Sequence, residues 1–192
     1  MNSRQPFSRR RFLASGSLAA SSLAFPWVSV RNVLGANNRL NIAAIGSGGK
    51  GGVDIGYCGG ENVVALCDVD ARNAAGTFKK FSQAKVYQDF RKLFDKESHN
   101  IDAVTISTPD HTHAHPAIIA MRAGKHVYCQ KPLTHTVEEA RILTRIARET
   151  GVVTQMGNQG HSQTDSRRLV ELIRAGVIGD VKEAHIWTDR PI

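Results

Sequence analysis

A glycine-rich turn between two short apolar runs constrains what this chain can fold into more than any other stretch. Residues 40–45 form the first apolar run, and Gly46, Gly48 and Gly51 follow it at the spacing G-x-G-x-x-G, before a second run at residues 63–67. Gly46 allows a tight turn, Gly48 leaves room for a phosphate beside the backbone, and Gly51 lets a helix pack closely on the strand. Glycine clusters also mark ordinary turns, but the flanking runs favour a strand, a helix and a second strand.

An acid follows the second run at a distance that suits a dinucleotide site. Asp68 lies close to the separation of about 20 residues from Gly46 at which an acid accepts the hydroxyl groups of an adenosine ribose. The phosphates of such a dinucleotide would lie at free N–H groups of the helix N-terminus, where the helix dipole favours negative charge. An acid at this position repels a 2′-phosphate, so it predicts NAD rather than NADP, while the nearby Arg72 leaves NADP open.

Neither the charge nor the cysteine content of the chain indicates a nucleic-acid or metal partner. The 192 residues carry a formal charge of +8, but five of the 25 basic residues are arginines within residues 1–36, which contain no acid. The other 20 basic residues stand against 17 acidic ones, a balance that gives no basic surface of the kind that binds nucleic acid. The odd number of cysteines and the absence of C-x-x-C predict no disulfide framework and no zinc site. Cys67 and Cys129 fall in predicted strands, so we expect buried free thiols.

Residues 1–36 are predicted to be an export signal. Residues 8–13 include three consecutive arginines and resemble the twin-arginine (Tat) consensus, and an uncharged run rich in Ser, Ala and Gly continues to Val30. A signal of this kind predicts export of the folded protein by the Tat machinery to the periplasm or cell envelope. The run is long enough to leave an alternative open, in which an uncleaved signal anchors the protein in the membrane.

The rest of the chain alternates short apolar runs with helical patterns. Strands are expected at residues 40–45, 63–68, 85–87, 103–108, 126–129 and 152–156, and helices at 51–58, 71–81, 90–95, 114–123, 137–150 and 165–175. This alternation predicts an α/β fold with a Rossmann-type doubly wound parallel sheet. We expect this fold to occupy residues 37–160. Residues 161–192 are expected to form a connecting helix and, at 181–188, the first strand of a second α/β domain.

Several polar residues and glycines fall directly after predicted strands. In a parallel sheet the carboxyl ends of the strands lie at one edge, and ligands bind in the crevice beyond it. The residues at these positions are Gly46, Asp68, Thr108, Pro109, Gln130, Lys131 and Asn158. Their shared position predicts one ligand site more strongly than any single motif does.

Four motifs in this order resemble the Gfo/Idh/MocA oxidoreductases, the family of glucose–fructose oxidoreductase and inositol dehydrogenase. The motifs are residues 46–51, 67–70, 108–113 and 130–132, and the similarity extends over residues 38–190. The runs at residues 155–162 and 187–192 are similar to a Tat-exported branch of that family. The resemblance implies NAD as the cofactor, bound by Gly46, Ser47, Gly48, Gly49, Lys50, Gly51, Asp68, Thr108, Pro109, His111, Gln130, Lys131 and Asn158.

The resemblance gives the catalytic role to Lys131. It implies a position beside the nicotinamide and the reacting hydroxyl, where an ammonium group polarises the substrate oxygen. The family usually has Glu-Lys-Pro where this chain has Gln130-Lys131-Pro132. Gln130 keeps the capacity to hydrogen bond but lacks the charge, so we expect the surroundings of Lys131 to differ from the usual ones.

Three closely spaced histidines offer a different interpretation of the same region. His111, His113 and His115 resemble a metal cluster, because neutral imidazoles suit zinc or iron. No carboxylate pattern accompanies them, and the family motif already includes this turn, so we expect no metal. Instead His111 is expected to face the cofactor, and His113 and His115 to open a helix. His161 is left open as a substrate contact or an ordinary polar residue.

The implied activity is the oxidation or reduction of a hydroxyl on a sugar, sugar acid or cyclitol. Members of the family carry a second α/β domain that supplies most of the sugar pocket, so this chain is expected to be the truncated, cofactor-binding half of a homo-oligomeric enzyme. Two alternatives stay open. A redox-neutral enzyme, such as an NAD-dependent glycosidase, would keep NAD tightly bound, which suits export away from a free nicotinamide pool. A non-catalytic fragment would bind the nucleotide without turnover.

Overall fold

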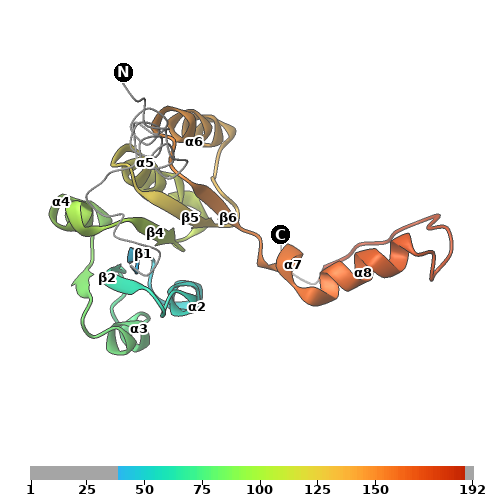
Figure 1. The fold of residues 1–192 in the computed structure, drawn as a ribbon, viewed down its shortest axis with the longest axis horizontal. Helices are drawn as coiled ribbons and strands as arrows, with labels where there is room; N and C mark the ends of the chain where they lie inside the picture. Colours follow the sequence, from blue (N-terminus) through green and yellow to red (C-terminus); the bar gives the residue numbers. More distant parts are fainter. Residues whose placement is uncertain (1–38, 189–192) are drawn as a thin grey trace, which may run out of the picture. The chain divides into compact units, whose positions relative to one another are not determined.

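The computed structural model describes residues 39–188, so the predicted export signal at residues 1–36 lies outside the described residues. Within this range six parallel strands form one sheet in the order β3-β2-β1-β4-β5-β6 (Figure 1). The strands are β1 (Asn41–Ile45), β2 (Asn62–Cys67), β3 (Lys85–Tyr87), β4 (Ala103–Ile106), β5 (His126–Gln130) and β6 (Thr154–Gly157). This order confirms the predicted Rossmann-type doubly wound sheet.

Helices connect the strands at the places that the sequence predicts. They are α2 (Gly49–Tyr57), α3 (Ala75–Lys80), α4 (Phe90–Glu97), α5 (Ala114–Arg122) and α6 (Val137–Thr150), followed by α7 (Gln159–Ser162) and α8 (Thr164–Arg174), with short 3-10 turns η1 (Ser98–Asn100) and η2 (Asp110–Thr112). A capping box between Thr136 and Glu139 begins α6, and Gly151 ends it at φ +67°. Between residues 39 and 188 no helix is long and apolar enough to span a membrane.

Helices cover both faces of the sheet at its central strand β1. In β1, Ala43 and Ile45 join an apolar cluster that includes residues of α4, α5 and α6. Ile42 and Ala44 point the other way, into a second cluster with residues of α2 and α3. A central strand that is covered on both faces must be apolar at every position, which explains why the first run has no alternation of polar and apolar residues.

The two cysteines in predicted strands are buried free thiols, as expected. Cys67 ends β2 and Cys129 lies in β5, and neither forms a disulfide. Burial raises the pKa of both thiols to about 12, with neighbouring carboxylates adding to the rise at Cys67. Both thiols are therefore protonated and weakly nucleophilic near neutral pH.

The predicted strand at residues 181–188 is wrong. This segment has no regular secondary structure, although its apolar residues favour a strand. A strand needs a neighbour to pair with its N–H and C=O groups, and none of the six described strands pairs with it. The preceding helix α8 buries none of its residues. The division into a cofactor domain and a second domain at residue 160 stays a prediction.

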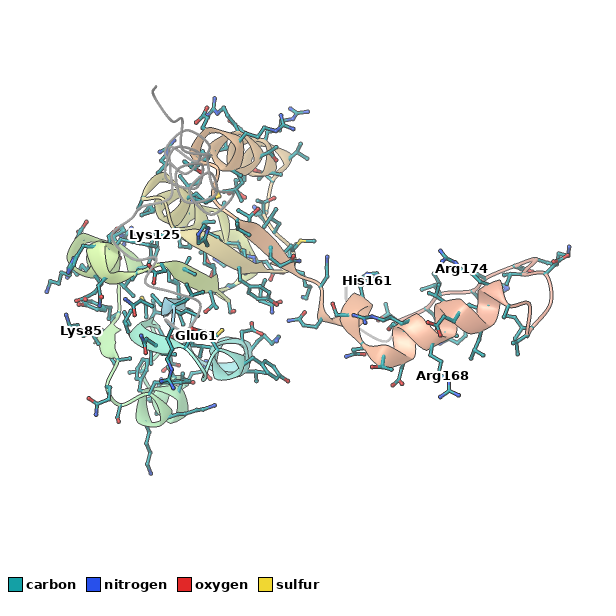
Figure 2. All side chains as sticks on the ribbon, viewed as in Figure 1. Glu61, Lys85, Lys125, His161, Arg168 and Arg174 are labelled. Carbon is teal, nitrogen blue, oxygen red and sulfur yellow. The ribbon has the colours of Figure 1, made fainter. Side chains whose placement is uncertain are left out.

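A buried carboxylate holds the short edge strand β3 against α4. Glu97 is only 3% exposed, and its carboxylate accepts hydrogen bonds from Lys85 Nζ at 2.8 and 3.0 Å and from the Tyr87 hydroxyl at 2.6 Å. Lys85 projects from β3, as Figure 2 shows. The hydrogen bond from Lys85, followed by that from Tyr87, lowers the pKa of Glu97. The same bond to Glu97 raises the pKa of Tyr87 to about 12.

We expect Glu97→Gln to lower the free energy of unfolding by about 1–3 kcal/mol at neutral pH, because a buried charged acceptor is lost. The folded-state pKa of Glu97 lies below its ordinary 4.5, so its stabilisation is complete above that value. It is lost as the pH falls through the folded-state pKa. Urea unfolding of both proteins, from about pH 3 to neutrality, measures this difference. Asp95→Asn removes an exposed carboxylate from the same helix, and equal losses in the two variants would contradict the prediction.

Candidate functional site

The register of the sheet brings the ends of four strands to one edge. Ile45 in β1 pairs with Cys67 in β2 and with Ile106 in β4, and Ile106 pairs with Cys129 in β5. The residues that follow these four positions include most of the predicted site. They meet where the strand order reverses between β1 and β4, which is the place where ligands bind in doubly wound sheets.

The glycine turn after β1 is possible only because two of its residues lack a Cβ. Gly46 has φ +79°, and a Cβ there would lie 2.6 Å from the carbonyl oxygen of Ser107. A Cβ on Gly51 would collide with the carbonyl oxygen of Gly46. Gly51 therefore brings α2 directly onto the end of β1, as the sequence predicts.

Gly48 meets a neighbouring loop on the side where a Cβ would stand. That Cβ would run into the side chain of Asn73, in the loop that follows β2. The close approach of this loop is a structural reason for glycine at this position. The expected phosphate contact at Gly48 stays a prediction.

Asp68 fastens the glycine turn to the end of β2. Its Oδ2 accepts hydrogen bonds from the N–H groups of Ser47, at 2.8 Å, and Gly48, at 2.7 Å, while its Oδ1 accepts from the N–H of Asp70 at 2.9 Å. An ionised carboxylate has about four lone-pair sites, so these three bonds leave capacity for a ribose hydroxyl. Sequence reasoning foresaw the position of Asp68 at the site but not this bond to the turn.

The N-terminus of α2 offers open hydrogen-bond donors. The helix begins at Gly49, two residues before the predicted start, and its cap residue Gly48 provides no side-chain bond. The N–H groups of Gly49 and Lys50 occupy the first two helical positions, which have no acceptor inside a helix. Both residues are exposed, so the positive end of the helix is accessible to an anion such as a pyrophosphate.

The segment after β4 supplies an unsatisfied polar atom to the same edge. The hydroxyl oxygen of Thr108 is buried and has no hydrogen-bond partner among the described residues. Pro109 and His111 follow it and are both exposed, His111 within η2. A buried hydroxyl without a partner is costly. The backbone of Thr108 lies against the glycine turn, because a Cβ on Gly46 would stand 2.8 Å from the Thr108 N atom.

His113 joins the segments after β4 and β5, although it was not among the predicted site residues. It is 1% exposed, with Nδ1 2.6 Å from the carbonyl oxygen of Pro132 and Nε2 2.8 Å from that of Thr108. It precedes α5, as expected, whereas His111 and His115 are exposed. No three potential metal ligands gather anywhere in residues 39–188.

Gln130 ends β5 and Lys131 follows it, and the two residues have opposite surroundings. Gln130 is 5% exposed, and Lys131, which precedes a cis-proline, is exposed. The backbone N–H of Lys131 lies 3.3 Å from Gln130 Oε1. The ammonium group of Lys131 forms no ion pair and no hydrogen bond within the described part of the chain. Asn158 is exposed at the end of β6, just before α7, which carries the exposed His161.

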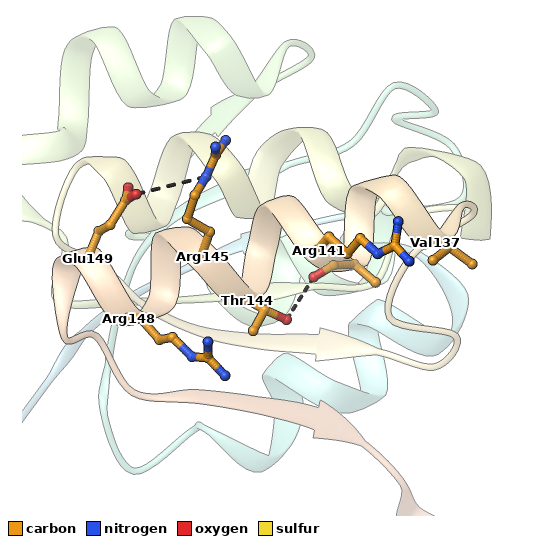
Figure 3. A pocket seen from close by; sticks show the side chains of 7 residues that line it. Val137, Arg141, Thr144, Arg145, Arg148 and Glu149 are labelled. Carbon is orange, nitrogen blue, oxygen red and sulfur yellow. Dashed lines mark hydrogen bonds and ion pairs between the residues drawn. The ribbon is translucent and has the colours of Figure 1, made fainter.

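A separate groove runs along the outer surface of α6 and contains none of these residues. It has a volume of about 440 Å³ and is lined by Val137, Ala140, Arg141, Thr144, Arg145, Arg148 and Glu149. Figure 3 shows three arginines along this helix, with Arg145 directed at Glu149. Every lining residue comes from one helix, so the groove is a solvated helix surface and does not enlarge the candidate site.

Comparison with known proteins agrees with this geometry. A family model described as an oxidoreductase family with an NAD-binding Rossmann fold, Gfo/Idh/MocA, matches residues 40–158. The chain belongs to the Gfo/Idh/MocA family. This confirms the family resemblance, while membership of a Tat-exported branch stays a prediction.

The names of two relatives within the Gfo/Idh/MocA family indicate that those proteins act on a sugar or a cyclitol. Inositol 2-dehydrogenase of Rubrobacter xylanophilus is 29% identical over 76% of this chain and 42% of its own length. The 1,5-anhydro-D-fructose reductase of Ensifer adhaerens is 34% identical over 67% of this chain and 38% of its own length.

Solved structures give the same picture. Myo-inositol 2-dehydrogenase from Lactobacillus plantarum matches with a TM-score of 0.67 and 26% identity over 75% of this chain and 43% of that structure. GenD2 from gentamicin A biosynthesis, solved in complex with NAD, matches with a TM-score of 0.63 and 28% identity over 70% of this chain and 39% of that structure. The chain thus spans about two fifths of the length of these relatives.

We expect Gly51→Ala to lower the free energy of unfolding by about 2 kcal/mol or more, because its Cβ would force α2 away from β1. Gly76→Ala is the matched control, since Gly76 lies in helix α3 and its Cβ would meet nothing within 4 Å. That change should be neutral or stabilise by up to about 1 kcal/mol. Thermal unfolding followed by circular dichroism measures both, and similar behaviour of the two variants would contradict the packing described.

Proposed function

We propose that this chain is the cofactor-binding half of an NAD-dependent oxidoreductase that acts on a hydroxyl group of a sugar, sugar acid or cyclitol. The observation that carries this proposal is the meeting of the glycine turn, Asp68 and Lys131 at one edge of the sheet, next to the buried, unpartnered hydroxyl of Thr108. The names of the family relatives support the substrate class. Because the chain covers about two fifths of those relatives, the remaining part of the pocket would come from a second domain.

Each part of the edge would then have a distinct task. Asp68 would accept the adenosine ribose hydroxyls, and the open N–H groups of Gly49 and Lys50 would bind the pyrophosphate. NAD, when bound, supplies the acceptor of a hydride. Lys131, whose ammonium group has no partner within residues 39–188, would donate a hydrogen bond to the substrate oxygen and stabilise negative charge that develops there.

A redox-neutral reaction with permanently bound NAD is the second candidate, and the export signal at residues 1–36 favours it. We propose that the protein is carried by the Tat machinery to the periplasm or cell envelope. An enzyme there has no free nicotinamide pool to draw on, so it must retain and regenerate its cofactor. A sugar oxidoreductase that recycles NAD, or a glycosidase that oxidises and then reduces its sugar, meets this requirement.

We expect Asp68→Asn to reduce the affinity for NAD by about tenfold, because a charged acceptor becomes a neutral one. The affinity for NADP should fall less or rise, since the repulsion of its 2′-phosphate is removed. Calorimetric titration of both nucleotides gives the NAD-to-NADP affinity ratio, which a general loss of folding would not change. Asp95→Asn is the control and should leave the ratio as it is. An unchanged ratio in Asp68→Asn would contradict the assigned role.

Native mass spectrometry of the protein from its own cell envelope tests export and cofactor retention together. If the signal is cleaved, we expect a mass that lacks residues 1–36. If it is retained, we expect the intact signal and a protein in the membrane fraction. In either case we expect bound NAD. Incubation with sugars and glycosides then separates the two candidates. A dehydrogenase releases NADH into solution, whereas the redox-neutral enzyme converts its substrate without net NADH. Nucleotide binding without any conversion of substrate would leave the non-catalytic fragment. A protein without nucleotide that binds none on addition would overturn both candidates.

A further inference from the structure

Helix α2 carries a buried carboxylate that the glycine motif does not account for. Asp54 is 6% exposed and lies one turn after Lys50. It accepts hydrogen bonds from the Ser107 hydroxyl at 2.8 Å and from Gln130 Nε2 at 2.8 Å, and it forms an ion pair with the Lys50 ammonium. Taking a carboxylate out of water is costly unless donors of this kind replace the water. These three donors do so, and each comes from a segment that also supplies the candidate site.

The partners of Asp54 lie next to the residues assigned to the cofactor and the substrate. Ser107 immediately precedes Thr108, and Gln130 immediately precedes Lys131, whose N–H lies 3.3 Å from Gln130 Oε1. Asp54 thus connects the helix after β1 with the ends of β4 and β5. Asp68, which marks the adenosine side, stands at the end of β2 on the other side of β1. The Asp54 cluster therefore lies on the nicotinamide side.

The cluster continues into the segment after β6. With the amide of Gln159 oriented by its hydrogen-bond partners, its oxygen accepts from Lys50 Nζ at 2.9 Å and from Gln130 Nε2, and its nitrogen donates to the carbonyl oxygen of Gly157 at 3.1 Å. The Lys50 ammonium is therefore held between Asp54 and Gln159. Its charge is balanced by a carboxylate of the protein, while the Lys50 side chain is 49% exposed.

We propose that Asp54 is a positioning residue for the nicotinamide half of the cofactor, acting through Gln130 and Lys50. This inference rests on the proposed function. Its carboxylate fixes the Gln130 side chain, which in turn meets the backbone of Lys131, and it holds the Lys50 ammonium inside the cluster. The fixed negative charge of this part of the site is then carried by the helix at position 54, while the strand end at position 130 carries only a neutral amide.

The test compares two ligands that differ only in the half that Asp54 is proposed to serve. NAD and ADP-ribose share the adenosine and the pyrophosphate, but ADP-ribose lacks the nicotinamide. Calorimetric titration of the full chain with each ligand gives an affinity ratio. We expect Asp54→Asn to lower the NAD-to-ADP-ribose ratio by about tenfold, in line with the loss of one charged hydrogen-bond partner. A purely structural role would weaken both ligands alike and leave the ratio unchanged.

A charge exchange sharpens this test. Gln130→Glu alone places two carboxylates in contact and should lower both the melting temperature and the ratio. The double variant Asp54→Asn/Gln130→Glu restores one carboxylate and one amide to the pair, with their places exchanged, and should recover most of both. If Asp54→Asn does not fold, Ser107→Ala removes one bond to the same carboxylate and should give a smaller fall in the ratio.

Glu97→Gln is the matched control, because Glu97 is a buried carboxylate in an ion pair with Lys85, away from the cluster. It should lower stability and leave the ratio unchanged. The proposal is overturned if Asp54→Asn behaves like Glu97→Gln, or if the double variant shows no recovery over Asp54→Asn. Binding of neither ligand to the unaltered chain would instead overturn the proposed function, and this inference with it.

Discussion

The contact between Gly51 and the carbonyl group of Gly46 determines the geometry on which the rest of the site depends. Because a Cβ has no room there, α2 begins close to the end of β1, and its open N–H groups lie at the carboxyl edge of the sheet. Asp68 reinforces this arrangement by accepting from Ser47 and Gly48. The donors that the proposed function assigns to the pyrophosphate are thus backbone N–H groups, whose positions are set by the fold.

The segments around this turn are held by hydrogen bonds of different kinds on the two sides of the site. On the β2 side the half-buried carboxylate of Asp68 bonds to backbone N–H groups. On the β4 and β5 side the bonds are made by two buried side chains. Asp54 accepts from the side chains of Ser107 and Gln130, and His113 contacts the backbone carbonyl oxygens of Thr108 and Pro132. Buried polar groups with several partners are rigid, since moving one leaves the others unpaired. The side that is assigned to the reacting half of the cofactor is therefore held by buried polar side chains.

The sequence was sufficient for features that depend on local pattern. The apolar runs, the glycine spacing and Asp68 predicted the strands, the turn and the shared edge, because each follows from periodicity or from the conformation of single residues. Asp54 and His113 could not be found this way. Asp54 lies in an amphipathic helix where an acid is normally exposed, and its partners Ser107 and Gln130 are distant in sequence. The prediction for residues 181–188 failed for a related reason, since a strand depends on a neighbour that local pattern does not reveal.

The hydrogen bond between Glu97 and Lys85 of the edge strand β3 also affects whether the sheets of two molecules can associate. A sheet edge presents unpaired N–H and C=O groups to which a strand of another molecule can add. Here β3 is only three residues long and carries Lys85, whose ammonium is fixed to Glu97. An approaching strand would find little backbone to pair with and a charged side chain beside it. Glu97 therefore also keeps this edge in a form that discourages association of one sheet with the next.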